Sequence, residues 1–184
     1  MRKTNNKLRL EKVNIDNFIP LIKLKVRKDQ KGFVASNVGS LAEAYIAIIS
    51  GGYPQPFGIF LEDKPVGFLM IGYYPDLEYA KKYADEGEAT PYFMDQSYLI
   101  WRLMIDKKYQ GKGYGRQALQ LALDYIYTFP VGKAKYIWLS YEPSNETARN
   151  LYRSLGFKEV KKMPKGWDEI PAVIKIKTNN KINQ

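Results

Sequence analysis

The stretch from Tyr98 to Arg116 constrains the fold more than any other part of this 184-residue chain. It begins with an apolar and aromatic run, Tyr98 to Ile105, which is typical of a buried strand. A glycine-rich turn follows. Beyond the turn, apolar residues recur at the spacing of one helix face, at Leu119, Ala122, Leu123 and Ile126. A buried strand that leads through a tight turn into an amphipathic helix indicates an α/β fold.

Periodicity predicts further elements on both sides of this unit. Strands are expected at residues 8–13, 57–61, 66–73, 136–141 and 171–176, and helices from residue 15, at 41–49 and at 145–155. We expect Asp16 and Asn17 to cap the first helix, and Ser40, with Glu43 three residues later, to cap the second. Gly156 is expected at the C′ position of the last helix.

Length and composition narrow the class of protein. The chain is long enough for one domain with a real core, expected at residues 1–177, followed by a polar tail at 178–184. Its apolar runs are far shorter than the roughly 18 residues that a membrane-spanning helix needs, and the basic start leads into no apolar signal segment. We therefore expect a soluble, cytoplasmic protein with no membrane partner.

The side chains available for catalysis are restricted, because the chain has no cysteine and no histidine. Disulfides, thiolate nucleophiles, Ser-His-Asp triads and the usual zinc sites are excluded, and no metal site is expected. The net charge of +10 favours an anionic partner, either nucleic acid or a cofactor rich in phosphate. The same charge also serves solubility, so charge alone does not decide.

The turn Gln110-Gly111-Lys112-Gly113-Tyr114-Gly115-Arg116 has the composition of an anion site. Glycines permit positive φ, and the unpaired amides of a first helical turn attract an anion together with the helix dipole. Lys112 and Arg116 add positive charge. The spacing fits neither a Walker loop nor a GxGxxG fingerprint. Taken alone the turn is a weak signal, since many helices begin after glycines.

A second motif makes the signal more specific. The first motif is Q-x-x-G-x-G at Gln110–Gly115, and the second is N-x-x-A-x-x-L-Y-x-x-x-G-F at Asn145–Phe157. In this order the chain resembles the GNAT superfamily of N-acetyltransferases, over at least residues 100–157. Gln30 and residues 40–43 and 58–67 resemble, more loosely, its diamine or spermidine acetyltransferase branch. The resemblance implies an α/β (α+β) domain whose central, mixed and mostly antiparallel twisted sheet has six to seven strands and about four flanking helices.

The resemblance also implies acetyl-CoA as cosubstrate and assigns roles to residues. Backbone groups of Leu103, Met104 and Ile105 would meet the pantetheine arm, and the segment Gln110 to Arg116 would hold the pyrophosphate. Asn145 would meet the pantetheine or acetyl end, and Tyr152 would act as general acid near the sulfur. Judged from the residues alone, Asn145 is a helix cap and Tyr152 a core aromatic.

An amine acceptor must lose a proton before it attacks a thioester, because alkylamines have pKa values of about 10.4. Without histidine, the proton acceptor would be Glu142, at the end of its strand, or a water molecule. Glu142 is equally well explained as a solvated residue beside Pro143. Since no cysteine can carry the acetyl group, we expect direct transfer in a ternary complex.

The sequence is compatible with several chemical classes of acceptor. Between residues 75 and 95, only two lysines accompany six carboxylates, those of Asp76, Glu78, Asp85, Glu86, Glu88 and Asp95. That charge suits a polyamine such as spermidine or spermine, although charge runs are usually solvated loops. The alternatives are a peptide, a protein or another small amine as acceptor, a basic nucleic-acid-binding module, and a homologue that binds acyl-CoA without turnover. A homodimer is compatible with the resemblance.

Overall fold

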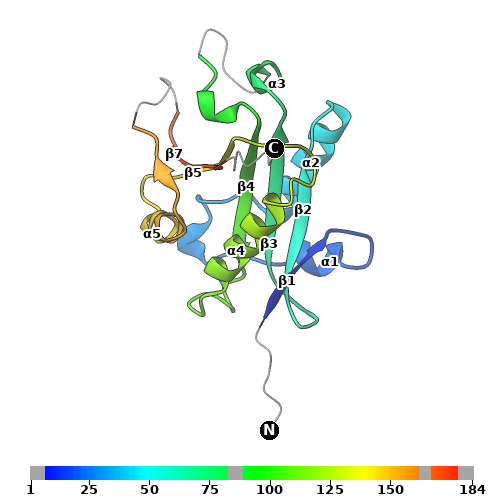
Figure 1. Cartoon of the computed structure of the whole chain (residues 1–184). Helices are drawn as coiled ribbons and strands as arrows, with labels where there is room; N and C mark the ends of the chain where they lie inside the picture. Colours follow the sequence, from blue (N-terminus) through cyan, green and yellow to red (C-terminus); the bar gives the residue numbers. More distant parts are fainter. Residues whose placement is uncertain (1–6, 83–88, 162–166, 178–184) are drawn as a thin grey trace, which may run out of the picture. The chain divides into compact units, whose positions relative to one another are not determined.

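The computed structural model describes residues 7–82, 89–161 and 167–177, and Figure 1 shows their secondary structure. The described strands are β1 (Leu8–Lys12), β2 (Gln55–Leu61), β3 (Lys64–Tyr74), β4 (Ser97–Ile105), β5 (Tyr136–Tyr141), β6 (Lys158–Glu159) and β7 (Ile170–Lys175). The described α-helices are α1 (Phe18–Ile22), α2 (Asn37–Ile49), α3 (Leu77–Lys81), α4 (Tyr114–Ile126) and α5 (Glu146–Ser154).

The strands form one seven-stranded sheet in the order β1-β2-β3-β4-β5-β7-β6. The pairs β1–β2, β2–β3, β5–β7 and β6–β7 are antiparallel, whereas β4 and β5 run parallel. The mixed, mostly antiparallel sheet predicted from the sequence is therefore confirmed. The additional helix is the short α3, which Asp76 begins by accepting a hydrogen bond from the Tyr79 amide at 2.7 Å.

The chain divides into two compact units. Unit 1 comprises Met1–Gly72 and Ile100–Pro130, and unit 2 comprises Tyr73–Leu99 and Val131–Gln184. The single domain at residues 1–177 stays a prediction, and the polar tail at 178–184 lies outside the described residues. None of the helices in the described ranges is long and apolar enough to cross a membrane.

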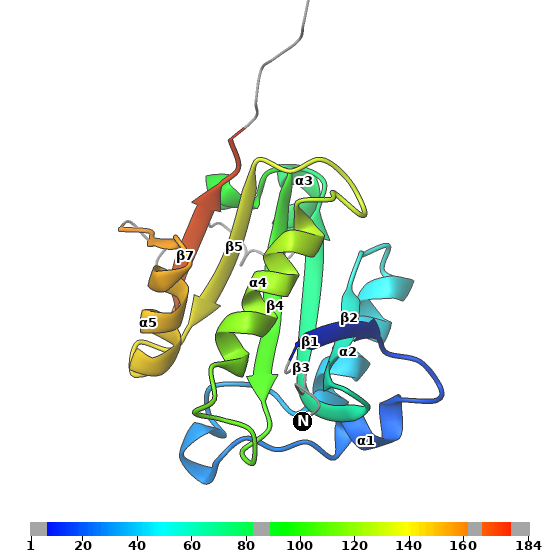
Figure 2. The ribbon, with the colours of Figure 1, turned by 60° about the horizontal axis from the view of Figure 1, so that its bottom comes forward.

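In unit 1, helices cover both faces of the strands (Figure 2). The predicted stripe of α4 is fully buried, and Tyr125 of this helix contacts Phe57 of β2 with ring centroids 5.1 Å apart. Phe68, Met70 and Met104, from β3 and β4, pack instead with Ala44 of α2. Because Phe57 pairs with Leu69 and side chains alternate along a strand, Phe68 and Met70 point away from α4.

Of the predicted helix caps in unit 1, Ser40 is wrong, and Asn17 has the predicted position without the predicted side-chain bond. Helix α2 begins at Asn37, and its N-cap is Ser36, whose hydroxyl accepts the Gly39 amide at 3.1 Å. Ser40 lies inside the helix and donates to the Ser36 carbonyl. The cap of α1, Asn17, makes no side-chain cap hydrogen bond, since its oxygen accepts the amide of Asn14 upstream.

In unit 2, helix α5 packs against β5 and ends as its sequence predicts. Tyr152 of α5 contacts Tyr141 of β5, with ring centroids 5.5 Å apart. Gly156 has a φ of 91° and donates to the Arg153 carbonyl, while Phe157 donates to the Tyr152 carbonyl, both at 3.1 Å. These two bonds form a Schellman motif. The same motif brings the rings of Tyr152 and Phe157 within 6.0 Å of each other.

Candidate functional site

The glycine-rich turn leads directly into α4 in unit 1. Gly111 and Gly113 have φ values of 75° and 76°, and Gly113 is the N-cap of the helix. The first intrahelical bond in this region runs from the Gln117 amide to the Gly113 carbonyl, at 3.2 Å. Among the described residues, no hydrogen-bond acceptor meets the backbone amides from Gly111 to Gly115. This turn therefore offers a row of backbone donors to a ligand.

A side-chain network holds the turn in place. The Gln110 amide group donates to the Ile105 carbonyl and to Gln30 Oε1, both at 2.8 Å, so it ties the turn to the end of β4. Arg27 donates to Gln110 Oε1 at 2.8 Å. Gln110 was predicted to contact the cosubstrate. In the structure its side chain holds the turn in place, and the backbone amides of the turn would make that contact.

The charge around the turn suits a diphosphate. Helix α4 has no acidic residue in its first turn, and Arg116 is exposed on it. Lys112 is also exposed, and its ammonium lies 5.6 Å from the centre of the Tyr109 ring. Unpaired amides at a helix N-terminus attract anions, and nearby cations strengthen the hydrogen bonds. The residues present thus fit the pyrophosphate of coenzyme A.

The end of β4 lies next to β3 at a place where only glycine fits. A Cβ atom at Gly67 would come within 2.5 Å of the Met104 carbonyl oxygen, which is backbone and moves only with its strand. Met104 and Ile105 are buried and Leu103 is half-buried. Because the Ile105 carbonyl accepts from Gln110, this oxygen is already used within the protein.

Asn145 and Tyr152, the residues of the second motif, belong to unit 2. Asn145 is the N-cap of α5, since its side-chain oxygen accepts the Ala148 amide at 3.1 Å, which confirms the capping interpretation. Tyr152 is half-buried between the rings of Tyr141 and Phe157. Burial, and then the negative charge of Glu169, raise the pKa of Tyr152 above its ordinary value, which already keeps the hydroxyl protonated at neutral pH.

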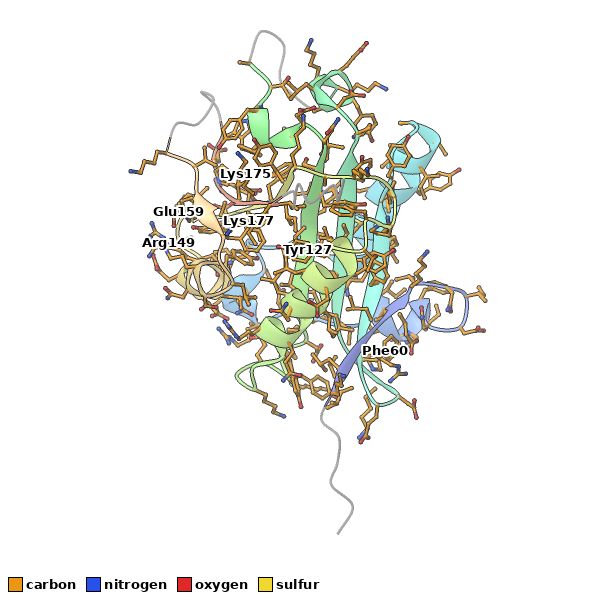
Figure 3. The ribbon with its side chains drawn as sticks, in the orientation of Figure 1. Phe60, Tyr127, Arg149, Glu159, Lys175 and Lys177 are labelled. Atoms are coloured by element: carbon orange, nitrogen blue, oxygen red, sulfur yellow. The ribbon has the colours of Figure 1, made fainter. Side chains whose placement is uncertain are left out.

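An ion-pair network that the sequence analysis missed supports α5 (Figure 3). Two nitrogens of Arg149 donate hydrogen bonds to the Glu159 carboxylate, at 2.8 and 3.2 Å. The Tyr141 hydroxyl donates to the same carboxylate at 2.7 Å. The bonds from Arg149 and then Tyr141 lower the pKa of Glu159 to about 2. Burial and the bond to Glu159 raise the pKa of Tyr141 to about 12. The network fixes the strand residue against which Tyr152 packs.

The predicted proton acceptor, Glu142, follows β5 directly and is half-buried. Its backbone carbonyl accepts the Asn145 amide at 2.9 Å, which shapes the entry into α5. A second carboxylate, Glu169, stands at the same end of the strand pair, because Tyr141 of β5 faces Ile170 of β7. Glu169 was not singled out from the sequence, since only strand pairing brings it beside β5.

Two carboxylates of the acidic segment at residues 75–95 make contacts within the protein. Asp76 caps α3, and Asp95 forms an ion pair with Lys135 at 2.6 Å. Glu78 is exposed. Asp85 and Glu86, like Glu88, lie outside the described residues.

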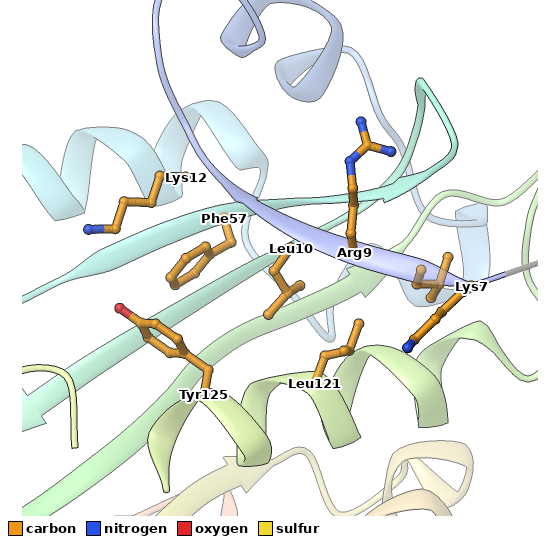
Figure 4. A pocket seen from close by; sticks show the side chains of 8 residues that line it. Lys7, Arg9, Leu10, Lys12, Phe57, Leu121 and Tyr125 are labelled. Atoms are coloured by element: carbon orange, nitrogen blue, oxygen red, sulfur yellow. The ribbon is translucent and has the colours of Figure 1, made fainter. Parts of the chain in front are cut away.

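Unit 1 also carries an open groove between β1 and α4, seen in Figure 4. Its apolar and aromatic lining comes from Leu8, Leu10, Phe57, Leu121 and Tyr125. Tyr125 donates a hydrogen bond to Gln55 at 2.5 Å. The groove does not include any residue of the glycine turn.

Known proteins similar to this chain include N-acetyltransferases. A model of the acetyltransferase (GNAT) family matches residues 28–157. A probable spermine N(1)-acetyltransferase of Bacillus subtilis subsp. natto (strain BEST195) is 29% identical over 150 residues, which cover 82% of this chain and 87% of that protein. The spermidine N(1)-acetyltransferase of Escherichia coli (strain K12) is 39% identical over 57 residues, 31% of this chain and 30% of that protein.

Among solved structures, an aminoglycoside acetyltransferase in complex with coenzyme A has the same fold. Its TM-score is 0.64 at 17% sequence identity, and the match covers 92% of this chain and 95% of that chain. The family match extends over both motifs, from the glycine turn to Phe157. The chain thus belongs to the acetyltransferase (GNAT) family of acetyl-CoA-dependent acyltransferases.

Proposed function

We propose that this enzyme transfers the acetyl group of acetyl-CoA to a small primary amine, by direct transfer in a ternary complex. The observation that carries the proposal is the row of unpaired backbone amides at Gly111–Gly115, capped by a glycine with left-handed φ and flanked by Lys112 and Arg116. Acetyl-CoA supplies an activated thioester, and the turn holds its pyrophosphate.

In this proposal Tyr152 protonates the departing thiolate. Its hydroxyl carries a proton at neutral pH, since an unperturbed tyrosine has a pKa of about 10 and burial raises the pKa of Tyr152 further. The backbone of Leu103, Met104 and Ile105, with Asn145, contacts the pantetheine arm and the acetyl group. Glu142 or a water molecule takes the proton that the ammonium form of the acceptor must lose. Because the chain has no cysteine, no acetyl-enzyme thioester intermediate forms.

Polyamines are the acceptor class that the sequence relatives support, since the two relatives described above are named for spermine and spermidine. The acidic run contributes less than its sequence suggests, because Lys135 neutralises Asp95. A homodimer is proposed by analogy with the family.

The test is an acetylation assay with spermidine, spermine, lysine and a peptide panel, with products identified by mass spectrometry. We expect acetylated spermidine or spermine, and preference for a peptide would contradict the polyamine assignment. Tyr152→Phe is expected to lower kcat while the dissociation constant of acetyl-CoA stays unchanged. Tyr127→Phe, an exposed tyrosine at the end of α4, is the control. Equal turnover in both variants would show that the general acid is misassigned.

A further inference from the structure

Unit 2 carries an aromatic cluster on the face of β5 that points away from α5. Tyr141 contacts α5, and because side chains alternate along a strand, Trp138 and Ser140 lie on the other face. The Trp138 ring has neighbours at centroid distances of 5.8 Å for Tyr74, 5.3 Å for Phe93 and 6.2 Å for Trp167. Trp138 and Phe93 are buried, whereas Tyr74 and Trp167 are half-buried. The cluster thus has a packed base and partly exposed rings.

A carboxylate stands beside this cluster. In the antiparallel register Ser140 faces Pro171 of β7, and the Ser140 hydroxyl donates to the Glu169 carboxylate. The Trp167 ring contacts the Trp138 ring, so both Trp167 and Glu169, from the segment that precedes β7, contact the face of β5 that carries Trp138 and Ser140. This segment therefore places an aromatic ring and a carboxylate on the same face of β5.

Among the residues that the structure describes, no ion pair neutralises the Glu169 carboxylate. It is half-buried, and in the part of the chain that the structure describes no lysine or arginine nitrogen lies within 4.0 Å of it. The contrast with Glu159 is clear, because Arg149 and Arg153 both pair with that carboxylate. In a chain with a net charge of +10, an unneutralised and partly desolvated carboxylate attracts an external cation.

The rings of the cluster are suited to the same kind of ligand. Tryptophan and tyrosine faces attract ammonium groups within about 6 Å of the ring centre. Tyr79, whose ring lies 5.6 Å from that of Tyr74, already has the Lys82 ammonium 5.2 Å from its own centre. Aromatic rings beside a carboxylate can attract an ammonium group through both the ring faces and the negative charge.

We propose that Glu169, with the rings of Trp167, Tyr74 and Trp138, binds the ammonium group of the acceptor amine. This inference rests on the proposed function and adds the subsite that selects a cationic acceptor. The charge of Glu169 also acts on the Tyr152 hydroxyl, so the site lies within electrostatic reach of the proposed general acid. Glu169 acts in binding, and Glu142 or water still takes the proton.

The test measures binding without acetyl-CoA, so that it does not depend on turnover. Tryptophan emission is titrated with choline and with its neutral isostere 3,3-dimethylbutan-1-ol. We expect saturable binding of choline, and affinity for the alcohol lower by about tenfold or more, because only the cation interacts with both the rings and the carboxylate. Absence of saturable choline binding, or equal affinity for the two probes, would overturn the proposal.

Variants then assign the site to its residues. Glu169→Gln keeps the shape and the bond from Ser140 and is expected to weaken choline binding about tenfold. Asp168→Asn, the same charge change at the adjacent exposed residue, is expected to leave the affinity unchanged. Trp167→Leu is expected to weaken binding several-fold and Trp167→Phe less, since phenylalanine keeps an aromatic face. Equal losses for Glu169→Gln and Asp168→Asn would overturn the assignment.

A kinetic measurement separates this inference from the proposed function. If the enzyme acetylates amines, Glu169→Gln raises KM for the amine about tenfold and leaves KM for acetyl-CoA unchanged. A fall in kcat with both KM values unchanged would contradict the binding role of Glu169. If no amine is acetylated but choline binds as described, the ammonium site stands and the proposed acetyl transfer falls.

Discussion

Replacing Gly113 by alanine tests a residue of the turn whose backbone is left-handed. Gly113 has a φ of 76°, and a Cβ atom built there has no heavy atom within 4 Å. The cost of Gly113→Ala is therefore conformational and not steric. A left-handed backbone costs an L-residue about 1–2 kcal/mol. For a chain of this size each kcal/mol shifts Tm by about 2–4 °C, so we expect a fall of about 2–8 °C.

The same substitution reports on the ligand. If the backbone at position 113 relaxes out of the left-handed region in this variant, the amides beside it change direction and lose their fit to the ligand. A hydrogen bond to a charged group contributes about 1.5–3 kcal/mol, so loss of one such bond corresponds to at least about tenfold in affinity. Calorimetric titration with coenzyme A measures that affinity, and differential scanning calorimetry measures Tm.

The control is Gly32→Ala, at a glycine that has equally open surroundings but no left-handed φ. This variant is expected to keep the wild-type Tm or to exceed it slightly, because alanine lowers the entropy of the unfolded chain. Gly113→Asn is expected to recover part of the loss, since asparagine tolerates the left-handed region. If Gly113→Ala has the same Tm and coenzyme A affinity as Gly32→Ala, the reasoning about the turn is refuted.

Two further predictions concern α5. Because the pKa of Glu159 is lowered to about 2 from an ordinary 4.5, its ion pairs stabilise the fold above about pH 4.5 and this stabilisation is lost as the pH falls towards 2. Glu159→Gln should therefore lower Tm at pH 7 and flatten the acid limb of Tm against pH; an unchanged limb would contradict the role of Arg149. Asn145→Ala removes the N-cap and should lower the free energy of unfolding, measured by urea titration, by about 1 kcal/mol. Asn145→Asp keeps a capping oxygen and should lower it little. Equal losses in the two variants would show that the capping oxygen does not contribute to stability.

Local sequence patterns predicted the elements that depend on local chemistry. The strand at Ser97–Ile105, the turn and helix α4 were predictable because apolar periodicity and glycines act over a few residues. The Schellman end of α5 followed from Gly156 in the same way. The cap of α2 was misplaced because Ser36 and Ser40 carry the same capping group, and only the backbone of Ser36 has the extended conformation of a cap.

The contacts that the sequence did not reveal are those that depend on strand pairing. Glu159 lies ten residues after Arg149, yet they meet because β6 pairs with β7 and β7 with β5. Glu169 comes beside Ser140 by the same pairing. No periodicity within either segment specifies these partners, because register is set between strands.

The proposed binding of acetyl-CoA depends most directly on the row of amides from Gly111 to Gly115. The measurement that tests it is a crystal structure of the protein with coenzyme A. We predict that pyrophosphate oxygens lie within hydrogen-bonding distance of these amides, with Gly113 still at positive φ. A diphosphate bound elsewhere on the protein, with the turn making no contact to it, would contradict the central claim.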